Sequence, residues 1–266
     1  IGDIAVTKGT ASNFTAVSAT TYTATITPDS PPVEGNILLN VAVNLAIDSA
    51  SNGNDAAPQL SVVYDITAPT VIISGPATPV KAPFTATLTF NEDVTGLALA
   101  DITATNAGLS AFNASSATVY TVLVTPTTDG NVGIDLPASV ANDLAGNGNS
   151  VAGQYTVTYD STAPTVTITS PASLVNAPYT ATFTFNEPVT GFAIADITAN
   201  NAIVDTFVAV SSTVYTALVS PTTDGLVTLD VVTDSAIDTA TNGNIAATQH
   251  VVTYDATGPT VTISSP

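Results

Sequence analysis

The chain has 266 residues, and 21 acidic residues against 2 basic ones give it a net charge of −19. Binding to nucleic acid through phosphate neutralisation needs clustered lysine and arginine, and this chain offers only Lys8 and Lys81. Only 9% of the residues are charged while 45% are hydrophobic, which is typical of a folded protein and excludes a disordered acidic tail. No apolar run approaches the ~20 residues of a membrane helix, so we expect no membrane insertion.

The chain contains no cysteine, methionine or tryptophan. Disulfides, thiolate metal sites and cysteine nucleophiles are therefore excluded, and an extracellular protein of this composition would need another means of stabilisation. The sequence starts at Ile1 without a charged region followed by an apolar one. We therefore expect that processing or truncation has removed the natural start.

A repeat with a spacing of 95 residues is the strongest signal in the sequence. The segment Asp-Ile-Thr-Ala-Pro-Thr-Val that begins at Asp65 returns in closely similar form at Asp160 and Asp255, and Phe90-Asn-Glu returns at Phe185. The repeat predicts four parts: a partial unit at 1–64 that lacks its first strands, complete units at 65–159 and 160–254, and the first strand of a further unit at 255–266.

Both ends of the chain are incomplete copies of the repeat. Cut units would expose unpaired strand edges and half a core, so we expect the chain to be a window from a longer array. The alternative is a donor-strand-linked filament subunit, in which the C-terminal strand completes the truncated unit of a neighbouring chain. This alternative is weaker, because the N-terminal unit lacks about two strands and one donor supplies one.

Within a unit the apolar pattern has a period of two, as in Phe84-Thr-Ala-Thr-Leu-Thr-Phe. Such alternation is typical of half-buried antiparallel strands, and no window has the period of an amphipathic helix. Prolines and glycines divide the unit 65–159 into seven predicted strands at 70–74, 84–90, 101–106, 109–114, 117–125, 131–136 and 153–159. Seven short strands in this length predict an all-β fold of tandem immunoglobulin-like β-sandwiches joined end to end.

Four motifs extend this prediction: Asp-x-Thr-Ala-Pro-Thr-Val, Phe-Asn-Glu-x-Val-Thr-Gly, Ala-Asp-Ile-Thr, and a late Asp-x-Ala-x-Asn-Gly-Asn loop before Val-Thr-Tyr-Asp. Together they resemble the bacterial Ig-like repeats of giant surface adhesins and extracellular filament proteins. The resemblance implies a cell-surface or secreted array whose repeats act as spacer, stalk or filament body, often rigidified by Ca²⁺. It also implies further Ig-like repeats, of the same or neighbouring chains, as partners.

Enzymatic chemistry finds little support in the sequence. His250 is the only histidine, and Leu60 and Tyr155 take its place in the other units. A serine nucleophile would depend on that single residue, and no nucleophile elbow occurs. We therefore expect a non-enzyme. The alternative to a structural role is an adhesive module that binds surface glycans or proteins.

The acidic residues indicate a calcium site at each unit boundary. If the strands alternate in direction, the incoming linker and the loops after the second and sixth strands lie at one end of the unit. Ca²⁺ prefers six to eight oxygen ligands, and Asn147 or Asn149 could add amide oxygens. The alternative is that Asp65 and Asp143 are ordinary turn residues. The predicted ligands are Asp65, Glu92, Asp101 and Asp143 in one unit and Asp160, Glu187, Asp196 and Asp238 in the next.

Two further acidic residues sit before glycine in a predicted turn. Asp129-Gly and Asp224-Gly lie between the fifth and sixth strands of their units. Asp-Gly is ordinary turn chemistry, so we expect no function there.

Overall fold

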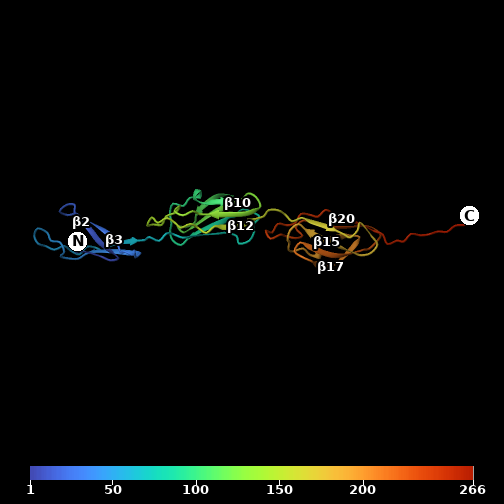
Figure 1. Cartoon of the computed structure of the whole chain (residues 1–266), viewed down its shortest axis with the longest axis horizontal. Coiled ribbons are helices and arrows are strands. Elements are labelled where there is room, and N and C mark those ends of the chain that lie inside the picture. The colour runs from blue at the N-terminus through green and yellow to red at the C-terminus, as the bar shows by residue number, and fades with distance from the viewer. Residues whose placement is uncertain (266) are drawn as a thin grey trace.

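The computed structural model describes residues 1–265. Three units lie in a row along the long axis, and the C-terminal segment projects from the third (Figure 1). Within the described residues, the helical elements are two single turns of 3₁₀ helix, η1 (Leu99–Asp101) and η2 (Ile194–Asp196). Among residues 1–265, no helix has the length and apolarity needed to cross a membrane.

The unit 65–159 is a sandwich of two antiparallel sheets. One sheet has the strand order β6-β7-β10-β9 and the other the order β12-β11-β8. The strands are β6 (Val71–Ser74), β7 (Phe84–Phe90), β8 (Thr103–Thr105), β9 (Ala107–Ala114), β10 (Val119–Pro126), β11 (Gly130–Asp135) and β12 (Tyr155–Tyr159). The predicted Ig-like sandwich is confirmed.

The unit 160–254 repeats this architecture. Its sheets have the orders β13-β15-β18-β17 and β14-β20-β19-β16, and the short β14 pairs in parallel with β20. The strands are β13 (Val166–Thr169), β14 (Leu174–Val175), β15 (Tyr179–Phe185), β16 (Ile197–Asn200), β17 (Ala202–Ala209), β18 (Val214–Pro221), β19 (Gly225–Val231) and β20 (His250–Tyr254).

The cores follow the period-two pattern of the sequence. On β7 the side chains of Phe84, Ala86, Leu88 and Phe90 are buried, and the threonines between them face outward. Burying a large apolar side chain of this kind contributes roughly 1.5–3 kcal/mol. Each complete unit has its own cluster of buried residues, so each is stabilised largely by itself.

The third strand of the unit 65–159 starts later than predicted. The chain first makes the turn η1, in which the Asp101 carboxylate accepts a hydrogen bond from the main-chain N–H of Ala98 at 2.8 Å. A side chain that bonds its own local backbone favours a turn over a strand. The predicted strand 101–106 is therefore reduced to β8.

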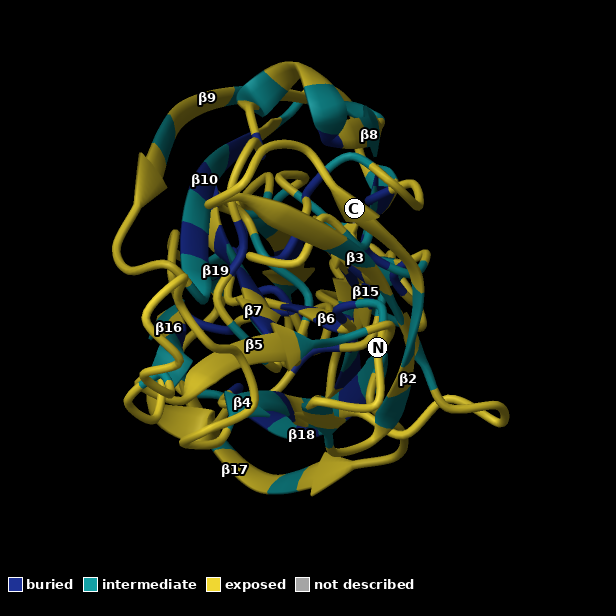
Figure 2. Cartoon of the chain, turned by 90° about the vertical axis from the view of Figure 1, so that its left-hand side faces the viewer, coloured by how far each residue is buried: buried dark blue, intermediate teal, exposed yellow. Residues whose placement is uncertain are grey.

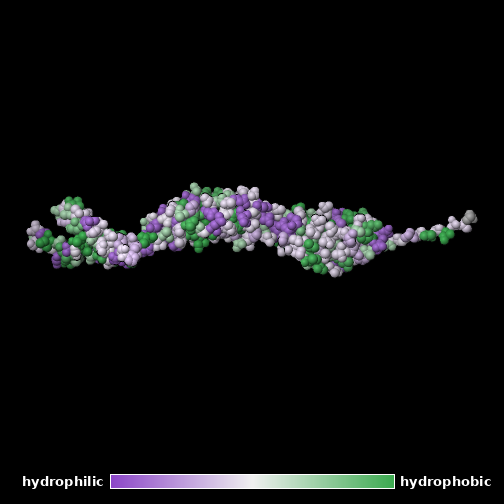
Figure 3. Space-filling view, in the orientation of Figure 1, coloured by the Kyte–Doolittle hydropathy of each residue, from purple (hydrophilic) through white to green (hydrophobic). Residues whose placement is uncertain are grey.

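The N-terminal unit has the counterparts of the last five strands, β8 to β12, of the unit 65–159. Its strands are β1 (Ile4–Val6), β2 (Gly9–Ala16), β3 (Tyr22–Pro28), β4 (Gly35–Val41) and β5 (Leu60–Tyr64), in sheets β1-β4-β5 and β2-β3. Ile37 is the one buried residue among 1–64. Strands β3 and β5 are mostly exposed (Figure 2), and hydrophobic side chains lie on the surface of this unit (Figure 3).

The C-terminal segment is the counterpart of β6 and β13. Val261 and Ile263 are 87% and 94% exposed, whereas the matching Val71 and Ile73 are buried under β7 and its neighbours. Residues 256–265 form no strand with any described part of the chain.

Candidate functional site

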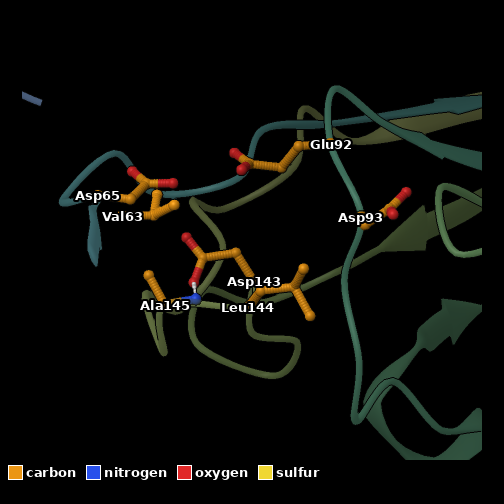
Figure 4. A pocket seen from close by; sticks show the side chains of 7 residues that line it. All are labelled: Val63, Asp65, Glu92, Asp93, Asp143, Leu144 and Ala145. Carbon is orange, nitrogen blue, oxygen red and sulfur yellow. Dashed lines mark hydrogen bonds between the residues drawn. The ribbon is translucent and has the colours of Figure 1, made fainter. Parts of the chain in front are cut away.

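Three acidic side chains converge at the entrance of each complete unit. Asp65, Glu92 and Asp143 each place one carboxylate oxygen within 4.8 Å of the other two. Figure 4 shows these three carboxylates facing a common space, whereas the carboxylate of Asp93 turns away from it. Asp160, Glu187 and Asp238 form the same arrangement in the next unit. We call these two groups of three the junction clusters.

Strand direction explains why these residues meet. Asp65 lies in the linker after β5, Glu92 follows the end of β7, and Asp143 lies in the loop between β11 and β12. Antiparallel pairing of β7 with β6 and of β11 with β12 brings those ends to the side where the linker enters. The site therefore joins a linker to two loops of the unit that follows it.

The loop around Asp143 is built on the carboxylate itself. Its Oδ1 accepts hydrogen bonds from the main-chain N–H groups of Ala145 and Asn147, both at 2.8 Å. Its Oδ2 accepts one from the side-chain amide of Asn147, also at 2.8 Å. Burial opposes ionisation of Asp143, but these bonds outweigh it and hold its pKa below the ordinary value. Asp143 is therefore ionised at neutral pH.

The amide of Asn147 also ties the loop to the linker. Its Nδ2 donates to the main-chain carbonyl of Asp65 at 3.1 Å, and Asn242 makes the matching bond to Asp160 at 2.9 Å. Asn149 has another role, because its Oδ1 accepts two main-chain hydrogen bonds at 2.9 Å within its own loop. Of the two asparagines considered as ligands, Asn147 borders the cluster and Asn149 shapes the loop.

The pKa values of Glu92 and Glu187 reflect burial and the negative charge of the neighbouring carboxylates. Partial burial, and then the charges of Asp65 and Asp143, raise the pKa of Glu92 above its ordinary value. Burial together with Asp160 and Asp238 does the same for the pKa of Glu187. Each cluster therefore favours uptake of a positive charge, either a proton or a cation.

Two of the predicted ligands lie outside the clusters. Asp101 accepts from the N–H of Ala98, and Asp196 accepts from the N–H of Ala193, both at 2.8 Å. Each carboxylate closes its 3₁₀ turn and is not part of the group of three. The sequence carries a signal for this, since an acid three residues after the start of a turn is typical of a cap.

The decisive comparison concerns the family of these sandwiches. A family model described as bacterial Ig-like domain matches residues 1–64, 65–159 and 160–254. The chain belongs to the bacterial Ig-like domain family. No curated protein sequence matches it.

Several solved structures are similar to this bacterial Ig-like chain. The Escherichia coli adhesin FdeC is 15% identical with a TM-score of 0.46, and the match covers 95% of this chain and 85% of FdeC. Invasin, a bacterial integrin-binding protein, is 14% identical with a TM-score of 0.40, covering 95% of this chain and 52% of invasin. Yersinia pseudotuberculosis InvD is 18% identical with a TM-score of 0.34, covering 74% of this chain and 60% of InvD.

The junction clusters of this bacterial Ig-like chain offer only oxygen donors. Carboxylates and the adjacent Asp65 carbonyl are the ligand types of a hard cation such as Ca²⁺, whereas Asn147 turns its NH2 group towards them as a hydrogen-bond donor. The single histidine lies elsewhere, with its Nε2 2.8 Å from the Ser170 hydroxyl. The ligand chemistry of the junction clusters is therefore that of a hard cation.

Proposed function

We propose that the chain is a structural, non-catalytic segment of an extended extracellular fibre or adhesin stalk, in which Ca²⁺ rigidifies the junctions between units. One observation carries this proposal. At both junctions a linker carboxylate and two carboxylates of the following unit converge within 4.8 Å. A cation held there would join the linker to two loops and restrict movement of the unit boundary.

Charge repulsion supports a cation at these places. Three carboxylates that share one space repel one another, and a bound divalent cation removes that repulsion. Because the cation would bind the folded junction and not the unfolded chain, occupancy adds stability that grows with concentration, about 2.7 kcal/mol per site at 100 times Kd. In a chain without disulfides, such a bound cation would provide a stabilising cross-link suited to an extracellular location.

The stalk role follows from the way the units are joined. The complete units have separate cores and succeed one another along the long axis (Figure 1). The linkers are a few residues long and contain Pro69 and Pro164, which fix the backbone φ. The lengths of such units add up to the length of the stalk. Their partners would be further Ig-like repeats.

An adhesive function is the alternative, and the exposed aromatic pair of the N-terminal unit is its best support. Phe14 and Tyr22 stack at 5.5 Å and are 46% and 54% exposed. The matching Tyr120 is buried, and its hydroxyl donates to the carbonyl of Val94 after β7. The N-terminal unit has no counterpart of that segment in this chain, which explains the exposure without a ligand.

Thermal unfolding with chelator and with millimolar Ca²⁺ tests the proposal. The expected result is a higher melting temperature in Ca²⁺, lost in a variant that carries Glu92→Gln and Glu187→Gln together. The matched control is Asp135→Asn with Asp230→Asn, because these carboxylates bond Gln154 and Gln249 and are not members of the junction clusters. A melting temperature that Ca²⁺ leaves unchanged would contradict the calcium site.

A further inference from the structure

A second set of acidic residues contacts every linker. Glu34, Asp129 and Asp224 recur at the 95-residue spacing of the repeat and are not members of the junction clusters. Each precedes a glycine with positive φ: Gly35 at 111°, Gly130 at 128° and Gly225 at 135°. Residues that have a Cβ rarely adopt this backbone conformation. The acid-glycine pair thus forms the same turn in all three units.

The carboxylate of Asp129 shows the contact most fully. Its Oδ1 accepts hydrogen bonds from the main-chain N–H and the hydroxyl of Ser161, both at 2.8 Å. Its Oδ2 accepts one from the hydroxyl of Thr162. The pattern recurs with Asp224 on Ala256 and Thr257 and with Glu34 on Ile66 and Thr67, where the main-chain bonds measure 2.8 Å and 3.3 Å.

Sheet register places each acid beside its linker. Gly130 pairs with Tyr159 at the end of β12, so the turn that holds Asp129 lies next to the first residues after that strand. From the other side, the carbonyl of Val80 accepts a hydrogen bond from the Asp160 N–H at 2.9 Å. The linker therefore leaves its unit between two fixed contacts.

Thr162 connects the contact at Asp129 with the junction cluster. Thr162 donates its hydroxyl to Asp129 and its main-chain N–H, at 3.0 Å, to the carboxylate of Asp160. Thr67 is shared between Glu34 and Asp65 in the same way. The acid of the preceding unit thus helps to orient the linker aspartate.

The third copy shows that the contact does not depend on a following unit. Asp224 holds Ala256 and Thr257, although Val261 and Ile263 beyond them are almost fully exposed. The contact is complete with only the preceding unit and the linker in place.

We propose that Glu34, Asp129 and Asp224 form a carboxylate clamp that binds the Asp-x-Thr segment of each linker and fixes the direction in which the chain leaves the unit. The clamp needs no cation. It rests on the proposed stalk function in one respect, because a fixed direction between units matters in an extended stalk. The Thr162 and Thr257 hydroxyls, followed by main-chain N–H groups, lower the pKa of Asp129 and of Asp224. Both clamps are therefore ionised at neutral pH.

Spin-label distance measurements on the full chain test the clamp. Because the chain has no cysteine, Thr156→Cys and Thr184→Cys place labels on outward positions of β12 and β15, on either side of the second junction. In chelator we expect a narrow distance distribution that becomes at least twice as wide in Asp129→Ala. Thr162→Val, which keeps the shape of the side chain, should widen it as well, whereas the charge-matched control Asp135→Ala should leave it narrow.

Unchanged widths in both Asp129→Ala and Thr162→Val would overturn the clamp. Calcium titration of the same samples separates this failure from failure of the proposed function. If wild type does not bind Ca²⁺ but Asp129→Ala still widens the distribution, the clamp stands and the calcium junction falls. If wild type binds Ca²⁺ and neither variant widens the distribution in chelator, the clamp falls and the calcium junction stands.

Discussion

The side-chain amide of Asn147 donates to the main-chain carbonyl of Asp65, 82 positions earlier, over 3.1 Å. This single bond connects the loop before β12 with the linker that enters the unit. The same amide also donates to the Asp143 carboxylate. Asn147 therefore connects two members of the junction cluster through its one side-chain amide group.

Replacing Asn147 by alanine should lower the free energy of unfolding of the unit 65–159 by about 1–2 kcal/mol, because two hydrogen bonds are lost and the partly buried carbonyl of Asp65 loses a donor. Urea unfolding measures the effect. Asn52→Ala in the N-terminal unit is the matched control, since the Asn52 amide reaches only Asp48. Equal losses in both variants would show that the bond to the linker contributes nothing.

Calcium titration calorimetry should give two ions per chain. The N-terminal unit has the Asp48 loop, in which the carboxylate accepts from Asn52 as Asp143 does from Asn147. It lacks the linker and glutamate partners, so it should not bind an ion. Glu187→Gln should leave one site. A stoichiometry of three would mean that the loop alone is sufficient, which contradicts the role assigned to the linker.

In chelator, stability should rise as the pH falls from neutral towards 4.5, the ordinary pKa of glutamate. The pKa values of Glu92 and Glu187 are raised in the folded protein, so the folded state binds protons in a range where the unfolded chain has released them. Stability is therefore lost as the pH rises through the raised pKa values. The melting temperature should depend less on pH in the variant that carries Glu92→Gln and Glu187→Gln. A wild type whose melting temperature does not rise as the pH falls would contradict the raised pKa values.

Tyr179→Phe should stabilise the third unit by about 1 kcal/mol, because the Tyr179 hydroxyl is buried without a hydrogen-bond partner among the described residues. Phe84 occupies the same place in the second unit, so Phe84→Tyr is the reverse control and should destabilise. Differential scanning calorimetry detects both changes. A lower melting temperature for Tyr179→Phe would show that the hydroxyl has a partner.

The strands were predictable because burial on one face imposes a period of two on the sequence. The prediction for 84–90 agrees with β7, and Phe84, Leu88 and Phe90 face the core as the alternation indicates. The 95-residue repeat then extended one unit to the whole chain. The shortened third strand was not predicted, since a local hydrogen bond from Ala98 to Asp101 competes with strand pairing.

The clamp could not be predicted from the pattern alone. Asp129 precedes a glycine, and Asp-Gly is common in turns for local reasons. Its contact with Ser161 depends on the register of β11 against β12, which places residues 32 positions apart side by side. Glu34 carries the one hint in the sequence. It stands at the repeat position of Asp129 and Asp224, where the negative charge is kept although the side chain is longer.

Small-angle X-ray scattering of the intact chain, in chelator and in saturating Ca²⁺, tests the central claim most directly. We expect an extended particle in both conditions, with a narrower range of unit orientations and a larger maximum dimension in Ca²⁺. The combined Glu92→Gln and Glu187→Gln variant should show no such change. Superimposable wild-type profiles in the two conditions would contradict the account of calcium-stiffened junctions.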